Sequence, residues 1–272
     1  MKRSMRALGR LLPVALVFLL LLTPAAHAAN VPAPDPDTEA PGFPLSLLRS
    51  LFGEDVEGTT TTIEILLLLT VLTLVPSILI LMTSFTRIVI VLSFTRNAMG
   101  TQQMPPNQVI IGLALFLTYF TMHGTLGRIY DEAWIPYQNE EIGLDEAYTS
   151  AVNPLREFMM GQIQLHEHEE DLATFMNLAR LGRPQTIEEV PTYVLIPSFI
   201  LSEIKTALRM GFLIFIPFIV IDMIVASALM SMGMMMLPPA MISLPFKLML
   251  FVLVNGWDWV VKSIIQSFTG SG

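Results

Sequence analysis

Long apolar segments separated by polar stretches dominate the chain after residue 60. Four of them lie at residues 65–86, 107–127, 199–230 and 244–261, and the first continues past a single arginine as the run IVIVLSF. Segments of this length with so little charge are typical of membrane-associated helices. The pattern predicts an all-α membrane-associated protein. We expect two long helical hairpins, residues 61–127 and 191–268, joined by a helical region at residues 128–190.

The two connections within these hairpins share one pattern. Residues 99–106 read Met-Gly-x-x-x-Met-Pro-Pro, and residues 232–239 read Met-Gly-x-x-x-Leu-Pro-Pro. Glycine can take the left-handed conformation that ends a helix, and proline fits the first turn of the next helix. We therefore predict hairpin tips formed by Gly100, Pro105, Pro106, Gly233, Pro238 and Pro239.

The N-terminal 60 residues have a different character. Residues 1–29 combine a basic start (Lys2, Arg3, Arg6, Arg10) with an apolar run and an Ala-His-Ala site, which is typical of a cleaved secretory signal peptide. An uncleaved anchor helix is the alternative. Residues 30–60 are rich in proline and acids and predict a disordered leader. Export of this end predicts a bacterial inner-membrane protein. Its hairpin tips would lie in the cytoplasm and residues 128–190 in the periplasm.

The region 128–190 is strongly acidic, with thirteen Asp and Glu residues against four arginines. Its apolar residues recur at helical spacing among the acids, as in Phe158, Met159, Ile163, Phe175 and Leu178. We expect amphipathic helices that form a periplasmic cap, with a mobile loop as the alternative. The acidic charge also argues against a nucleic-acid partner.

Recognisable enzyme and metal motifs are missing from the sequence. It contains no Cys, no HExxH, no GxxxxGK[ST] and no GxGxxG after a strand, so we expect neither an enzyme nor a cofactor. His166 and Glu170 have the only ligand-like spacing in the stretch HEHEED. A solvated acidic helix explains this stretch better than a metal site.

Charged residues also occur inside the apolar segments, namely Arg87, Glu203, Lys205, Asp222 and Lys247. Exposing these charged side chains to lipid would cost free energy. We therefore expect them to contact protein and to stabilise the assembly. Glu203 and Lys205 could instead extend to lipid headgroups. We predict that Glu203 pairs with Lys247 of another subunit. A single helix over residues 63–99 would be about 55 Å long, so either Pro76 breaks it or it leaves the bilayer.

Three long stretches resemble the FliP/SctR family of type III secretion export proteins. They span residues 84–120, 197–239 and 242–257 and include SFTRIVIVLSFTR, PSFILSEIKTALRMGF and ISLPFKLMLFVLVNGW. The tip TQQMPPNQ, the signal peptide and the run PPAMISLPFK favour the flagellar branch of the family. The resemblance implies a homo-oligomeric subunit of the flagellar export gate, located in the basal body, which forms a pore for unfolded flagellar proteins. Implied partners are FliQ-like and FliR-like gate subunits and the FlhA-like and FlhB-like export proteins.

The second tip carries the methionines Met232, Met234, Met235 and Met236, whereas the first tip has Thr-Gln-Gln at the equivalent variable positions. The turn itself therefore does not require methionine. Methionine is flexible and adapts to varied contacts, and the resemblance implies that this tip forms a gasket in the pore. Packing of an irregular helix end is the alternative.

A different class of function is also consistent with the pattern. In an ion-coupled secondary transporter, the two hairpins would be parallel repeats and Asp222, Glu203 and Lys247 would form a midplane ion site. The size of the detergent-extracted particle distinguishes the two functions, because an export gate is a large multi-subunit complex.

Overall fold

The chain divides into two units, residues 1–76 and 77–272. The computed structural model describes only part of the second unit, namely residues 77, 80–101, 104–182, 184, 186, 189–234 and 237–270. The expected signal peptide, the leader, Met235 and Met236 lie outside these described residues.

Every regular element in the described residues is helical, which confirms the all-α class. The elements are α4 (Phe85–Ala98), α5 (Asn107–Ile129), the π-helix η1 (Tyr130–Trp134), α6 (Ile135–Gln138), α7 (Leu144–Leu165), α8 (Glu169–Leu178), α9 (Thr192–Ser231), α10 (Pro239–Leu253) and α11 (Gly256–Thr269). By length and composition, Asn107–Gln138 and Thr192–Ser231 could each cross a membrane, and the bent pair of α10 and α11 adds a third candidate.

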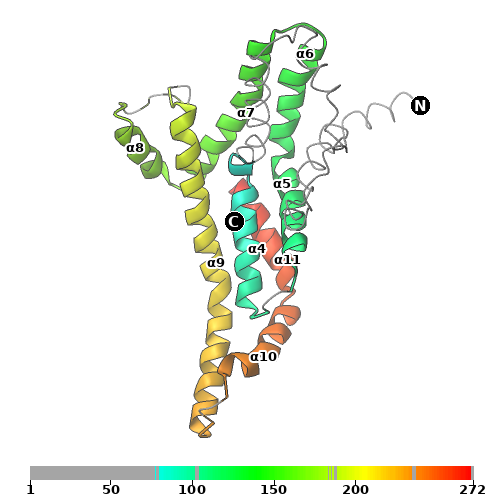
Figure 1. Ribbon diagram of the computed structural model, residues 1–272, viewed down its shortest axis with the longest axis vertical. Coiled ribbons are helices and arrows are strands. Elements are labelled where there is room, and N and C mark those ends of the chain that lie inside the picture. The colour runs from blue at the N-terminus through cyan, green and yellow to red at the C-terminus, as the bar shows by residue number, and fades with distance from the viewer. Residues whose placement is uncertain are drawn as a thin grey trace, which may run out of the picture. The chain divides into compact units, whose positions relative to one another are not determined.

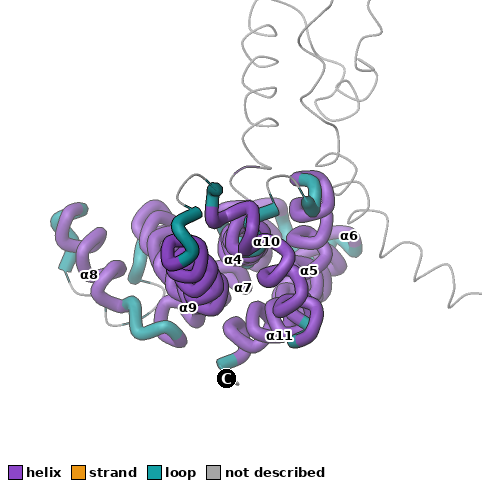
Figure 2. Tube along the Cα trace, turned by 90° about the horizontal axis from the view of Figure 1, so that it is seen from below, coloured by secondary structure: helices purple, strands orange, loops and turns teal. Residues whose placement is uncertain are grey.

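Helix α9 runs along most of the length of the described unit (Figure 1). Its 40 residues correspond to about 60 Å of helix. The neighbouring helices are unevenly distributed along it. Helices α7 and α8 pack near its beginning, α4 packs along its middle, and α10 packs on its second half. Seen from below, α9 lies between α8 on one side and α5 and α11 on the other (Figure 2).

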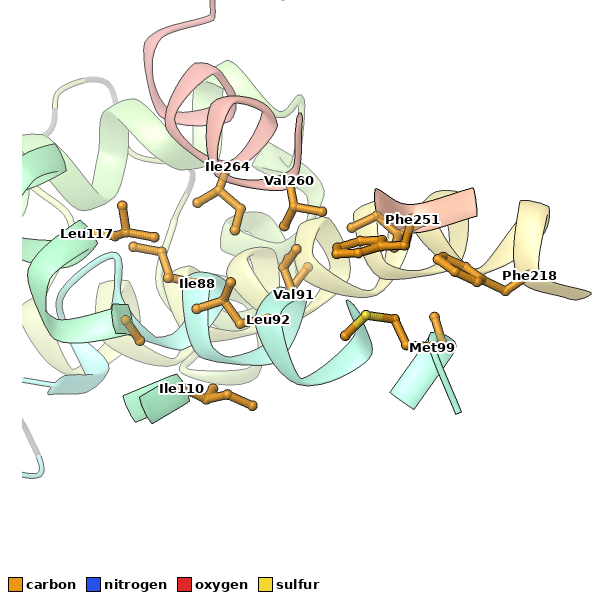
Figure 3. Packing of buried hydrophobic residues seen from close by; sticks show 14 of the residues in the cluster. Ile88, Val91, Leu92, Met99, Ile110, Leu117, Phe218, Phe251, Val260 and Ile264 are labelled. Atoms are coloured by element: carbon orange, nitrogen blue, oxygen red, sulfur yellow. The ribbon is translucent and has the colours of Figure 1, made fainter. Parts of the chain in front are cut away.

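Two clusters of buried apolar residues hold the helices together. The first joins α4, α5, α9, α10 and α11 around Ile88, Leu92 and Ile264, all of which are fully buried (Figure 3). The second joins α7, α8 and α9 around Met159, Ile163, Leu195 and Phe199. Phe158 of α7 packs against both clusters.

The acidic region folds into η1, α6, α7 and α8, as expected for amphipathic helices. Met159 and Ile163 are fully buried, and Phe158 and Phe175 pack against the second cluster. Leu178 differs from the other four, because its side chain is 74% exposed at the end of α8.

Both glycines at the hairpin tips take the left-handed conformation, with φ of 75° at Gly100 and 76° at Gly233. At the second tip the N–H of Met234 donates to the carbonyl oxygen of Leu229 at 3.0 Å, which closes the end of α9. Pro106 directly precedes α5, and Pro239 is the first residue of α10. The prolines thus lie where the missing N–H removes no helical hydrogen bond.

Two of the apolar segments are interrupted. Residues 63–99 do not form a single helix, because residues 82–84 form a turn before α4 begins, and Pro76 lies outside the described residues. The fourth apolar segment also breaks, since α10 and α11 meet at a bend of 63°. Asn255 there has φ of 50°, a left-handed conformation that asparagine tolerates well. A Cβ on the following Gly256 would lie only 2.3 Å from the Phe251 ring, so the bend requires glycine.

Candidate functional site

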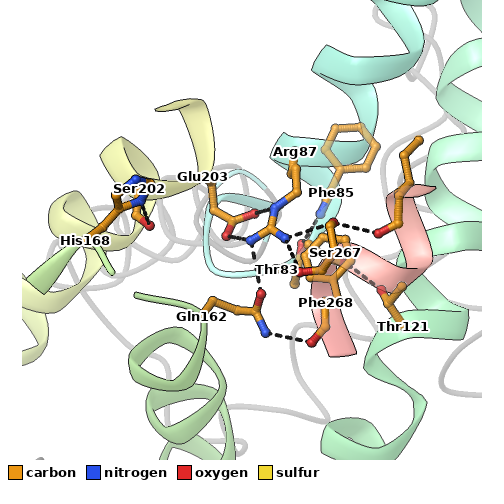
Figure 4. Close-up of polar contacts among 12 residues, drawn as sticks. Thr83, Phe85, Arg87, Thr121, Gln162, His168, Ser202, Glu203, Ser267 and Phe268 are labelled. Atoms are coloured by element: carbon orange, nitrogen blue, oxygen red, sulfur yellow. Dashed lines mark hydrogen bonds and ion pairs between the residues drawn. The ribbon is translucent and has the colours of Figure 1, made fainter. Parts of the chain in front are cut away.

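The centre of the described unit is a fully buried arginine on α4. Arg87 has no exposed surface, and neither has Glu203 on α9. Arg87 Nε donates to Glu203 Oε2 at 2.9 Å, and Nη2 donates to Glu203 Oε1 (Figure 4). The two bonds make a bidentate pair, which fixes both position and orientation.

The remaining donors of Arg87 reach two further helices. Nη1 donates at 3.0 Å to both the carbonyl oxygen and Oγ of Ser267 on α11. Nη2 also donates to Gln162 Oε1 on α7 at 3.0 Å, and Gln162 Nε2 donates to the carbonyl oxygen of Phe268 at 3.2 Å. The guanidinium carbon lies 4.0 Å from the centroid of the Phe268 ring. We call Arg87, Gln162, Glu203, Ser267 and Phe268 the arginine junction.

The arginine junction links α4, α7, α9 and α11 through one cation. A buried charge is tolerated only when its partners compensate for the lost water, and here every guanidinium nitrogen has a protein acceptor. The predicted Glu203–Lys247 pair is therefore wrong, because the Glu203 carboxylate is already bound by Arg87 within the chain.

A second ion pair connects α9 to α10. Lys247 Nζ lies 2.6 Å from Asp222 Oδ2, and Ser243 Oγ donates to Asp222 Oδ1 at 2.5 Å. The Lys247 side chain is 8% exposed, whereas that of Asp222 is 37% exposed and therefore in partial contact with the surroundings.

Lys205 differs from the other charges of the apolar segments. It pairs with Asp171 of α8, but its own side chain is 48% exposed. The prediction of a buried charge is therefore wrong for Lys205. Its long side chain reaches the carboxylate from the surface of α9.

The second half of α9 and α10 project beyond the other helices toward the second tip, and contact them at the base of the projection, where Ile214, Phe218 and Phe251 belong to the first buried cluster. We call residues 212–231, the tip at 232–238 and α10 the arm, and the helices α4, α5, α7, α8 and α11 with residues 192–211 the body. The arm exposes many large apolar side chains, including Phe212, Leu213, Met223, Ile224, Met230, Met241, Phe246, Met249, Val252 and Leu253. At its tip Met232 is 61% exposed and Met234 is 46% exposed.

The turn between α7 and α8 carries two histidines that sequence reasoning assigned to a solvated helix. That assignment holds for Glu169 and Glu170, which are exposed at the start of α8, but not for the histidines, because His168 Nδ1 lies 2.8 Å from Oγ of the buried Ser202 (Figure 4). His166 Nε2 is buried and has no hydrogen-bond partner. Burial, followed by the positive charge of Arg87, lowers the pKa of His166 to about 4.

Sequence reasoning also missed Gln162 and Ser267. Each is a polar residue on the apolar side of a helix, in the runs GQI and IQS. Polar residues at core positions indicate a buried hydrogen-bond network. The sequence therefore indicated that both residues could form buried hydrogen bonds, but it did not indicate which residues they bond to.

Comparison with known proteins identifies the lineage of the chain. Residues 68–264 match the FliP family. The flagellar biosynthetic protein FliP of Bacillus subtilis (strain 168) is 58% identical over 79% of this chain and 95% of that protein. The FliP of Pectobacterium carotovorum subsp. carotovorum is 54% identical over 78% of this chain and 81% of its own length. For FliP of Aquifex aeolicus (strain VF5), the identity is 49% over 84% of this chain and 95% of that one.

The matched region contains the entire arginine junction except for Ser267 and Phe268, together with the arm and the helices of the acidic region. Identities near one half over most of both chains exceed what shared composition alone would produce. The chain therefore belongs to the FliP family, whose members are non-enzymatic components of the flagellar export apparatus.

Proposed function

We propose that this chain is a pore-forming subunit of the flagellar type III protein export gate. Several copies assemble with FliQ-like and FliR-like subunits in the bacterial inner membrane, next to the FlhA-like and FlhB-like export proteins. Unfolded flagellar proteins pass through the pore, and the chain itself catalyses no reaction. Family membership supports the export role, and the structure of α9 supports the assembly.

The observation that carries the assembly is the length and exposure of α9. Its 40 residues correspond to about 60 Å, twice the roughly 30 Å thickness of a bilayer hydrocarbon core. Only 17% of its most apolar window is buried within the chain. Lipid can cover at most about half of such a helix. The body covers one side of its first half, and we infer that other protein subunits cover apolar side chains that remain exposed, because such a surface is unstable in water.

The arm is the part of the chain that fits a pore wall. It is a narrow projection whose exposed side chains are almost all aliphatic, aromatic or methionine. Copies of such a projection, placed around an axis, would bury these faces against one another and bring their tips together. The tips then present Met232, Met234 and their neighbours Met235 and Met236 to the lumen as a gasket.

Particle size after mild detergent extraction tests this assembly. The export gate predicts a stable complex with several copies of the chain, whereas the ion-coupled transporter predicts a monomer or dimer. The ion site of that transporter lacks support from the structure. Glu203 is bound by Arg87, and Asp222 lies nineteen residues further along α9, about 28 Å away.

The gasket has a test of its own. Replacing Met234, Met235 and Met236 together by Ala should preserve the turn, since Gly233 and the two following prolines remain. The smaller side chains should let ions pass through the closed gate. We expect increased ion conductance in cells that contain normal amounts of the complex. Normal conductance with normal assembly would assign the methionines to packing.

A further inference from the structure

The turn between α7 and α8 has an uncommon backbone. Glu167 takes a left-handed conformation with φ of 57°, which a side chain other than Gly, Asn or Asp rarely adopts. The N–H of Glu167 donates to the Gln164 carbonyl at 3.1 Å, and that of His168 donates to the Ile163 carbonyl at 3.0 Å. The contact of His168 with Ser202 helps to hold this turn, which the backbone of Glu167 disfavours.

The two imidazoles attach this turn to the body in different ways. His168 bonds to Ser202 on α9, as described above, and its ring centroid lies 6.2 Å from that of His166. The Nε2 atom of His166 is inaccessible to water and has no hydrogen-bond partner. A neutral imidazole tolerates this environment, since one ring nitrogen then carries no proton. The charged form would bury a second N–H, and only the backbone of Ser267 compensates in part for its lost hydration.

The charges around His166 are unfavourable to a second cation. Helix α4 contributes Arg87, α9 contributes Arg209, and the turn itself contributes His168, all of which act against protonation of His166. Of the nearby carboxylates, Glu203 is bound to Arg87 and Asp171 to Lys205. Glu167, Glu169 and Glu170 are exposed to solvent. On the side of α11, only the backbone of Ser267 favours the charged form.

We propose that the turn at residues 166–168 is an acid-sensitive latch, which holds α8 against α9 while His166 is neutral and releases it when His166 is protonated. The latch is a property of the chain and does not depend on the export-gate proposal. Opening would detach the His168–Ser202 and Asp171–Lys205 contacts together, because both lie on the segment that follows His166.

The pH dependence follows from the two pKa values. Released His166 has an ordinary pKa of 6.5, whereas in the closed latch the pKa falls to about 4. Between these values the open form binds more protons, so the closed form loses stability as the pH falls. Lowering the pH from 7.5 to 5.0 should raise the open population at least about tenfold by this linkage.

Hydrogen exchange of the full-length chain in detergent measures this opening directly. The amides of residues 166–171 are compared at pH 7.5 and pH 5.0 after correction for intrinsic exchange rates, with α4 amides as a report on the body. The parent should show the increase of at least about tenfold, and His166→Gln should show less than about twofold. His166→Lys should open the turn already at pH 7.5.

His123→Gln is the matched control, because His123 lies on α5 against Tyr119, away from the latch, and this variant should respond like the parent. Histidine NMR of the parent gives a second readout that needs no substitution, in which the His166 imidazole should titrate well below pH 6. A His166 pKa at or above 6.5 overturns the proposal. So does an undiminished pH response in His166→Gln while its α4 amides stay protected.

Discussion

The two halves of α9 belong to one continuous helix but have different surroundings. In the body, residues such as Phe199, Glu203 and Ala207 are completely enclosed by α4, α7, α8 and α11. In the arm, Ile214 and Phe218 still join the first buried cluster and α10 packs alongside, but side chains such as Phe212 and Met223 are more than 60% exposed. The body encloses its central ion pair and two apolar clusters within one chain, although α5 also exposes side chains such as Val109 and Phe120. The arm has surface that only lipid or other subunits can cover.

The ion pairs of the two regions show the same contrast. The Arg87–Glu203 pair is sealed from solvent on both sides, whereas Asp222 of the arm pair remains 37% exposed. A sealed pair fixes how four helices meet. A partly open pair connects just two helices and leaves a carboxylate edge at a surface that we assign to assembly.

The largest effect should come from breaking the sealed pair. Arg87→Met leaves the Glu203 carboxylate buried without a cation, which should cost about 3–5 kcal/mol of unfolding free energy. Chemical denaturation of the detergent-solubilised chain measures this loss. The double variant Arg87→Met with Glu203→Met should recover most of it, since no uncompensated charge remains. Equal instability of the single and double variants would contradict the assigned role of the pair.

Breaking the arm pair should cost less. Lys247→Met removes the cation next to Asp222, but the exposed part of that carboxylate can still be hydrated. We expect a loss of about 1–2 kcal/mol in the same denaturation experiment. A loss as large as that of Arg87→Met would mean that the arm is sealed within the single chain, and the contrast between the two regions would disappear.

A substitution on the surface of the arm should separate folding from assembly. Phe212 is 62% exposed, so Phe212→Asp should change the stability of the isolated chain by no more than about 0.5 kcal/mol. It should reduce the recovered multi-subunit complex at least about tenfold, because the new carboxylate would be buried between subunits. Tyr148→Asp on α7 is the control, since Tyr148 is 70% exposed on the body and should tolerate the change.

The smallest effect concerns an exposed ion pair of the body. Arg128 donates to the Glu157 carboxylate and thereby lowers the Glu157 pKa below its usual 4.5. The stabilising effect of this pair is therefore present above pH 4.5 and is lost as the pH falls through the lowered pKa. In the parent, the midpoint of thermal unfolding should fall slightly as the pH drops below 4.5. Glu157→Gln should abolish this contribution. A strong effect at pH 7 would show that the pair is shielded from water.

Much of this organisation could be predicted from the sequence. The apolar runs predicted the helices, and the repeated Met-Gly and Pro-Pro pattern marked the positions at which α4 and α9 end. The partner of Arg87 could not be predicted, because Glu203 is 116 residues away and any of several charges had suitable chemistry. The bend at Asn255 was missed although Asn-Gly is a recognised turn signal, because the surrounding residues are continuously apolar.

The most direct test of the central claim is photo-crosslinking from the tip of the arm. A crosslinking residue replaces Met234 in cells in which an exported flagellar protein, fused to a stably folded domain, is trapped during export. A second strain carries the same residue at Leu178 of α8, which is 74% exposed but belongs to the body. Our account predicts crosslinks to the trapped protein from position 234 and none from position 178. Crosslinks from neither position, with the complex assembled and the protein trapped, would show that the arm does not line the export path.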